Sequence, residues 1–164
     1  MAGTATPATT ALKKRGVEFL VHTYDHDPGA HSFGDEAVDE LSDALGVSPA
    51  QIFKTLIVRA PDGTLAVAVL PVPFRLSTKT FAATVGWAKV VMADRIEAER
   101  STGYVLGGIS PVGQRKTLRT VVDESALEWP RVLCSGGRRG LEIDLDPRDL
   151  VRVTDALVGA IATH

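Results

Sequence analysis

The sequence has few of the residues that mark several classes of protein. Its 164 residues include one cysteine, Cys134, which excludes an internal disulfide and a metal site built from several thiolates. Aromatic residues make up only 5% of the chain, so we expect an aliphatic core. No apolar run approaches the roughly 20 residues of a membrane span, and residues 1–10 lack the basic and apolar segments of a signal peptide. These absences favour a single-domain cytoplasmic protein, residues 1–164, without a membrane partner.

Charge is nearly balanced overall but unevenly distributed. The net charge of −2 excludes a globally basic nucleic-acid-binding protein. Residues 16–50 contain eight acidic side chains and no lysine or arginine, whereas residues 101–140 contain six basic and three acidic side chains. Because phosphate contacts supply most non-specific affinity for nucleic acids, we expect an RNA ligand to be held weakly and at one end.

Two glycine-rich segments next to basic residues stand out. Residues 103–113 precede an Arg-Lys pair, and residues 135–140 contain an Arg-Arg pair. Glycine permits positive φ and the close approach of a ligand, and such loops expose successive N–H groups that bind anions. The two segments indicate a pocket for a phosphate-bearing or carbonyl-bearing ligand. The alternative, which the glycines alone favour, is a pair of tight turns between strands.

Periodicity and turn signals predict helices and strands that alternate irregularly. The predicted helices cover residues 6–16, 34–45, 77–85 and 93–101, and a last one runs from Asp146-Pro147, with a break near Val153, to Ala162. The predicted strands cover residues 18–24, 53–60, 64–70, 89–92, 120–122, 132–134 and 141–145, and a polar loop covers 25–32. The turn signal Pro61-Asp62-Gly63 makes a hairpin of two strands. The pattern predicts one α/β domain of the α+β type with a mixed sheet.

Lys54 is the most informative single residue. It lies in the apolar segment Phe53–Val58, and lysine is rarely buried there unless it is paired. A strand lysine that faces a cleft serves as a fixed cation or as a base with a shifted pKa. The alternative, which the spacing alone favours, is a lysine at a sheet edge that reaches water and discourages edge pairing.

Other reactive side chains give weaker signals. Six of them cluster in ten residues, namely His22, Tyr24, Asp25, His26, Asp27 and His31. At this spacing the side chains do not point toward one common position, as a metal site requires. We therefore expect a polar rim with Tyr24 directed at the ligand. Cys134 ends an apolar strand with no histidine close in sequence, and we expect it to be buried rather than nucleophilic. The sequence contains no Gly-x-Ser-x-Gly, P-loop or Rossmann motif.

A series of short motifs follows a fixed order along the chain. They are His22-Thr23-Tyr24, Phe33-Gly34-Asp35-Glu36, Phe53-Lys54-Thr55-Leu56, Met92-Ala93-Asp94, Arg100-Ser101-Thr102-Gly103-Tyr104, Gly107-Gly108-Ile109-Ser110-Pro111 and Ser135-Gly136-Gly137-x-Arg139-Gly140-Leu141. Together they resemble the YbaK/EbsC family of bacterial Cys-tRNA(Pro) deacylases, from about Ala11 to the end of the chain. The resemblance implies a mixed sheet curled toward a barrel and surrounded by helices, with no cofactor and no metal.

The resemblance also implies a function. Proteins of this family are trans-editing enzymes, related to the editing domain of prolyl-tRNA synthetase, and they remove cysteine from proline tRNA. The implied partners are the acylated 3′ end of the tRNA and, transiently, prolyl-tRNA synthetase. Whether Cys-tRNA(Cys) is a second substrate stays open.

Site residues are carried over from the family's motifs onto matching positions. The implied catalytic residues are Lys54, Gly107 and Gly108. The implied substrate-binding residues are Tyr24, Phe33, Ile109, Ser110, Pro111, Gly136, Gly137, Arg139 and Glu142. Glu142 departs from the family, which often has aspartate at this position, and this puts its role in doubt.

The family mechanism fits the shortage of side-chain nucleophiles. The substrate thiol attacks its own ester carbonyl and releases a thiolactone, while the enzyme supplies proximity and stabilises the oxyanion. The enzyme is then a lyase, or a carboxylic-ester hydrolase if water attacks. Two alternatives stay open: a deacylase for Ala-tRNA(Pro) that uses water, and a non-catalytic domain that binds aminoacyl-tRNA or a nucleotide.

Overall fold

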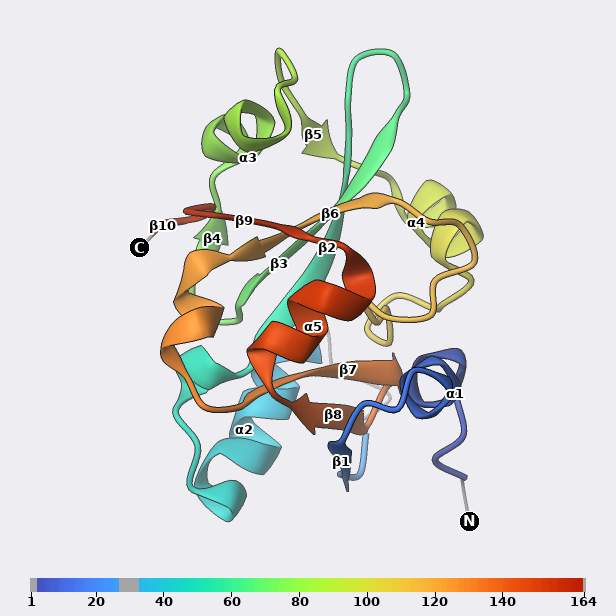
Figure 1. The fold of residues 1–164 in the computed structure, drawn as a ribbon, viewed down its shortest axis with the longest axis vertical. Coiled ribbons are helices and arrows are strands. Elements are labelled where there is room, and N and C mark those ends of the chain that lie inside the picture. The colour runs from blue at the N-terminus through green and yellow to red at the C-terminus, as the bar shows by residue number, and fades with distance from the viewer. Residues whose placement is uncertain (1–2, 27–32, 164) are drawn as a thin grey trace.

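The computed structural model describes residues 3–26 and 33–163 (Figure 1). The helices in these ranges are α1 (Pro7–Lys14), α2 (Phe33–Leu45), α3 (Thr78–Val85), α4 (Arg95–Thr102) and α5 (Pro147–Thr154), with short 3-10 helices at Pro49–Gln51 and Glu124–Glu128. The strands are β1 (Phe19–Thr23), β2 (Phe53–Arg59), β3 (Leu65–Pro71), β4 (Arg75–Leu76), β5 (Val91–Met92), β6 (Arg119–Asp123), β7 (Val132–Arg138), β8 (Leu141–Leu145), β9 (Leu157–Gly159) and β10 (Ala162–Thr163). None of the helices in these ranges combines the length and apolar character that a membrane crossing needs.

Two sheets carry most of the strands. The five-stranded sheet has the order β5-β2-β3-β6-β9, with antiparallel pairing at β5-β2-β3 and parallel pairing at β3-β6-β9. The three-stranded sheet β1-β8-β7 is antiparallel, and Figure 1 shows it at the lower end of the molecule, with α1 on one side and α2 on the other. This mixed pairing confirms the predicted α+β class. The partial closure into a barrel stays a prediction.

The hairpin of β2 and β3 forms as predicted. Gly63 has a φ of 91°, a conformation that residues with a side chain rarely adopt. The Asp62 carboxylate accepts a hydrogen bond from the Thr64 N–H at 2.9 Å and closes the turn. The turn fixes a register in which Phe53 lies opposite Pro71 and Thr55 lies opposite Val69.

The main core lies between the two sheets. Phe53 and Ile57, on one face of β2, are 2% and 3% exposed and belong to the same apolar cluster as Val69, Cys134 and Ile143. Cys134 is fully buried, and this burial raises the pKa of its thiol well above the ordinary value. The expectation that Cys134 is a core residue is therefore confirmed.

The second glycine segment is part strand and part turn, because residues 139–140 form the turn between β7 and β8, whereas residues 135–138 belong to β7. Strand β7 continues to Arg138, and its pairing with β8 shifts between Ser135 and Arg138, which marks a β-bulge. A Cβ atom at Gly136 would collide with the Leu141 side chain, and Gly137 has a φ of 110°. Close packing and bulge geometry, rather than a turn, require these glycines.

The prediction of a helix up to Ala162 is wrong beyond Thr154. Helix α5 ends where Asp155 adopts the left-handed conformation, with a φ of 51°. The chain then extends as β9, which pairs in parallel with β6. The small and β-branched residues after Asp155 read as a helical face by periodicity, but pairing with the sheet decides their conformation.

Asp123 connects the C-terminal segment to the sheet. Its carboxylate is buried and accepts hydrogen bonds from the N–H groups of Ile161 and Ala162, at 2.9 and 3.0 Å, and from the N–H group of Ser125 at 3.2 Å. A single side chain therefore caps the short helix after β6 and orders the segment between β9 and β10.

Asp123→Ala should destabilise the protein by about 3 kcal/mol, because it leaves buried N–H donors without an acceptor. Chemical denaturation monitored by circular dichroism measures this loss. Asp149→Ala is the control, since Asp149 pairs with Arg152 at the surface and should change stability by less than about 1 kcal/mol. Equal effects of the two substitutions would contradict the structural role of Asp123.

Candidate functional site

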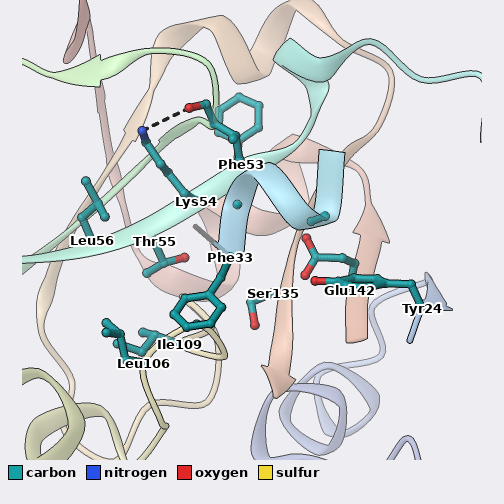
Figure 2. Close-up of a pocket in the computed structure, with 14 residues that line it drawn as sticks. Tyr24, Phe33, Phe53, Lys54, Thr55, Leu56, Leu106, Ile109, Ser135 and Glu142 are labelled. Carbon is teal, nitrogen blue, oxygen red and sulfur yellow. Dashed lines mark hydrogen bonds between the residues drawn. The ribbon is translucent and has the colours of Figure 1, made fainter. Parts of the chain in front are cut away.

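A cavity of about 320 Å³ opens beside β2, at the start of α2 (Figure 2). Its walls come from α2, β2, the sheet β7-β8 and the loop residues Leu106, Gly107 and Ile109. Of the residues proposed from the sequence, the ones that line it are Tyr24, Phe33, Lys54, Gly107, Ile109 and Glu142. The fold thus brings together positions that are up to 118 residues apart, since Tyr24 and Glu142 share this cavity.

The cavity exists because two strands separate. Ile52, just before β2, forms a parallel bridge with Leu133 of β7. Further along, β5 pairs with β2 at Val58 and Arg59. Within the described ranges no strand pairs with β2 on that side between these two contacts, and the cavity opens in this interval.

Lys54 is held by main-chain carbonyl groups. Its Nζ donates hydrogen bonds to the carbonyl oxygens of Val72 at 3.1 Å and Phe74 at 2.6 Å, and Figure 2 marks the bond to Val72. Burial lowers the pKa of the Lys54 ammonium, and the neighbouring Asp35 opposes that shift. Lys54 is therefore a partly buried, oriented amine, and not the exposed edge lysine of the alternative interpretation.

Phe33 forms one wall with the first glycine segment. The Arg139 guanidinium lies 4.3 Å from the centre of the Phe33 ring, and its Nε donates to the Leu106 carbonyl at 2.8 Å. A Cβ atom at Gly107 would come within 2.6 Å of the ring, and the φ of Gly107 is 88°. Glycine is thus required at position 107, so that the segment can pass directly over Phe33.

Several proposed site residues lie outside the cavity lining. Ser110 is fully buried, and its hydroxyl accepts a hydrogen bond from the Val112 N–H. The Gly108 N–H donates to the Val105 carbonyl at 2.8 Å, so this amide is already used within its own loop. The others that do not line the cavity are Pro111, Gly136, Gly137 and Arg139.

A second groove of about 400 Å³ lies next to Arg139, the residue whose guanidinium stacks on the Phe33 ring. Gly108, Gly137, Arg138 and Arg139 line it, together with residues 103–105. The two glycine segments meet here, because Gly108 packs directly against the Arg138 backbone. Arg139 lines only the basic groove, but it stacks on Phe33 and so lies at the border with the apolar cavity.

Glu142 is a buried acid in the cavity wall. It lies in the middle strand β8, opposite His22 of β1 and Ser135 of β7. The residue is only 6% exposed, and burial raises the pKa of its carboxyl to about 8. Burial, followed by the charge of Glu142, also raises the pKa of Tyr24. At neutral pH the carboxyl is mainly protonated and can donate a hydrogen bond to a ligand.

The histidine-rich segment forms separate pairs. His22 contacts the Asp144 carboxylate at 2.9 Å, and His26 contacts the Glu36 carboxylate at 2.8 Å. Asp27 and His31 lie outside the described residues, as does most of the predicted loop 25–32. Tyr24 does face the cavity, in line with the expected polar rim.

Sequence reasoning missed Thr55 and Ser135 as lining residues. Thr55 shares a strand face with the core residues Phe53 and Ile57, where an aliphatic side chain is the usual choice. A hydroxyl at that position was the available signal. Ser135 falls in the second glycine segment, for which the glycines alone favour a turn.

Comparison with known proteins places the chain among editing domains. Residues 35–153 match the aminoacyl-tRNA editing domain family. EbsC of Enterococcus faecalis, which its name proposes as a Cys-tRNA(Pro)/Cys-tRNA(Cys) deacylase, is 32% identical over 127 residues, or 77% of each chain. The solved structure of a hypothetical protein, APE2540, is 28% identical with a TM-score of 0.82 and covers 96% of this chain and 100% of its own. The structure of a proposed trans-editing enzyme for prolyl-tRNA synthetase shares the fold, at 24% identity, a TM-score of 0.80 and coverage of 100% and 99%.

The raised pKa of the Glu142 carboxyl predicts that the stability of the protein depends on pH. Its pKa rises from 4.5 in water to about 8 in the folded protein, so between these values the folded state holds a proton that the unfolded state releases. Stability should therefore fall as pH rises from about 5 to 8, by up to a few kcal/mol. Glu142→Gln, which stays neutral, should remove this decline, as melting temperatures between pH 5 and 9 would reveal. Parallel pH curves for the two proteins would contradict the assignment.

Proposed function

Because the chain belongs to the aminoacyl-tRNA editing domain family, we propose that it is a trans-acting deacylase that removes cysteine from proline tRNA. The observation that carries this proposal is the cavity beside β2, in which an oriented lysine, a buried acid and the Gly107 segment converge. Its volume of about 320 Å³ suits a small acyl group with part of a ribose.

The cavity and the groove have different parts in this proposal. Phe33 and Tyr24 confine the acyl group and the terminal nucleoside by apolar contact. Arg139, at the border with the basic groove, is placed to meet the phosphate that precedes this nucleoside. The ligand would thus pass from a basic groove into an apolar cavity.

The chemical step needs no enzyme nucleophile. The cysteine sulfur of the substrate attacks the ester carbonyl, a new S–C bond forms, and the C–O bond to the ribose breaks. The thiol proton ends on the ribose oxygen, and the products are a thiolactone and free tRNA. The enzyme holds sulfur and carbonyl together and stabilises the oxyanion.

Candidate donors to the oxyanion are the Gly107 N–H and the Lys54 ammonium, which lie in the same cavity. Gly108 is a weaker candidate than the sequence suggests, because its N–H already donates to Val105. The buried Cys134 takes no part in the step, since its thiol is fully covered by the core.

Recognition of the whole tRNA calls for a partner. The basic side chains near the cavity are few, and α2 on the other side of it carries Asp35, Glu36, Asp39, Glu40 and Asp43. Because affinity for the tRNA backbone follows the number of phosphate contacts, the protein alone would distinguish tRNAs poorly. We propose that prolyl-tRNA synthetase, in a transient complex, supplies the identity of the tRNA.

Lys54→Ala should lower the rate of Cys-tRNA(Pro) deacylation by about 10²–10³-fold, the usual effect of removing one donor to an oxyanion. Single-turnover release of labelled cysteine measures this rate. The matched control is Lys79→Ala, because Lys79 is exposed on α3, away from the cavity. Near-normal activity of the Lys54 variant would overturn its role.

The thiol mechanism predicts strong selectivity for the acyl group. Cys-tRNA(Pro) should be deacylated at least 10²-fold faster than Ser-tRNA(Pro) or Ala-tRNA(Pro), because serine and alanine lack the sulfur nucleophile. Trapping of the released thiolactone with an amine, followed by mass spectrometry, identifies the product. Comparable rates on alanine would instead favour attack by water and a deacylase for Ala-tRNA(Pro).

A further inference from the structure

Thr55 has a buried hydroxyl that no other group satisfies. Among the buried side-chain nitrogen and oxygen atoms of the described residues, Thr55 Oγ1 is the one without a hydrogen-bond partner. The side chain lies between Phe53 and Ile57 on the core face of β2, and opposite Val69 of β3. Valine would fill the same space without burying an unpaired polar atom. The hydroxyl is therefore costly to the fold and calls for another explanation.

The hydroxyl faces the cavity. Thr55 is a lining residue, and Figure 2 shows its oxygen on the side toward Phe33 and Ser135. The atom that the protein leaves without a partner therefore lies at the cavity wall.

The backbone of Thr55 also points to this side. The Ile52 carbonyl accepts from the Val72 N–H next to β3, whereas the Ile57 carbonyl accepts from the Ala93 N–H next to β5. Because peptide groups in a strand point alternately to the two neighbours, the N–H and C=O of Thr55 point away from β3. No strand in the described part of the chain pairs with β2 there, so both groups border the cavity.

We infer that Thr55 is a substrate-binding residue, and that its hydroxyl and its unpaired peptide groups hydrogen-bond the polar atoms of the aminoacyl ester. This inference rests on the proposed function for the identity of the ligand. Every aminoacyl ester carries an ammonium and an ester carbonyl close together. The Thr55 carbonyl can accept from the ammonium, while its N–H and hydroxyl can donate to the ester carbonyl.

This arrangement is a short form of strand addition. The free edge of a sheet binds an extended ligand through main-chain groups, and pockets beside it select the side chain. Here the ligand is a single aminoacyl group, and β2 offers one residue of free edge between its contacts with β7 and β5. The contacts are common to all amino acids, so Thr55 would hold the acyl group in place and leave selection to the rest of the cavity.

Thr55→Val is the decisive variant, because it keeps the shape of the side chain and removes the hydroxyl. Its kcat/KM on Cys-tRNA(Pro) should fall by 10-fold or more, while its melting temperature stays equal to that of the wild type or rises. Thr55→Ser, which restores the hydroxyl, should keep kcat/KM within about 3-fold of the wild type. The opposite behaviour, lower melting temperature with unchanged kcat/KM, would overturn the inference.

Thr120→Val is the matched control. Thr120 is buried in β6, and its hydroxyl has a partner in the Leu118 carbonyl. This variant should have a lower melting temperature than the wild type and an unchanged kcat/KM, which is the reverse of the result expected for Thr55→Val. Equal behaviour of the two valine variants would contradict a ligand role for Thr55.

A binding measurement separates this inference from the proposed function. The probe is an unreactive analogue, adenosine with cysteine joined through a 3′ amide, added to the intact protein in a thermal-shift titration. Wild type that binds the analogue more tightly than Thr55→Val, but does not deacylate Cys-tRNA, would support the inference and refute the proposed reaction. Equal binding by the two proteins would overturn the inference alone, and no binding by the wild type would overturn both.

Discussion

The divergence of β2 from β7 is the constraint on which the site depends. The two strands touch at Ile52 and Leu133, and then the register of β2 is governed by β3, its partner along the whole hairpin. Strand β7 instead follows β8 and bends at the bulge after Ser135. Since each strand has a stronger partner elsewhere, the interval between them stays open. The cavity thus lies where two well-paired sheets diverge.

The glycines serve this divergence more than they serve a ligand. Gly136 and Gly137 let β7 bulge without striking Leu141 and Tyr104. Gly108 lets its loop lie against the Arg138 backbone, and Gly107 lets it cross the Phe33 ring. Close backbone contact therefore brings the two glycine segments together beside the cavity. The Gly108 amide donates within its own turn, and an anion-binding role for the other N–H groups of these segments stays a prediction.

The hairpin and the helices up to α4 could be predicted from the sequence, because local turn and capping signals reveal them. The spacing around Lys54 alone favours a sheet edge, and only the family resemblance assigns this lysine to a site. The conformation of residues 155–163 could not be predicted, because a parallel strand far away in sequence decides it. The sequence also does not predict that Ser135 lines the cavity or that Ser110 is buried away from it. Motifs locate a candidate site along the chain, but only the packing of the two sheets decides which of their residues line the cavity.

The cavity combines groups that are costly to bury, and the rest of the fold must offset that cost. An unpaired hydroxyl such as that of Thr55 costs about 1–3 kcal/mol, and the Glu142 carboxyl adds a penalty once it ionises. Burial lowers the pKa of Lys54 and raises that of Glu142 to about 8. The cavity therefore carries less negative charge at neutral pH than the carboxyl of Glu142 suggests. Partial burial also strengthens each hydrogen bond to a bound ligand, because the local dielectric constant is lower than that of water.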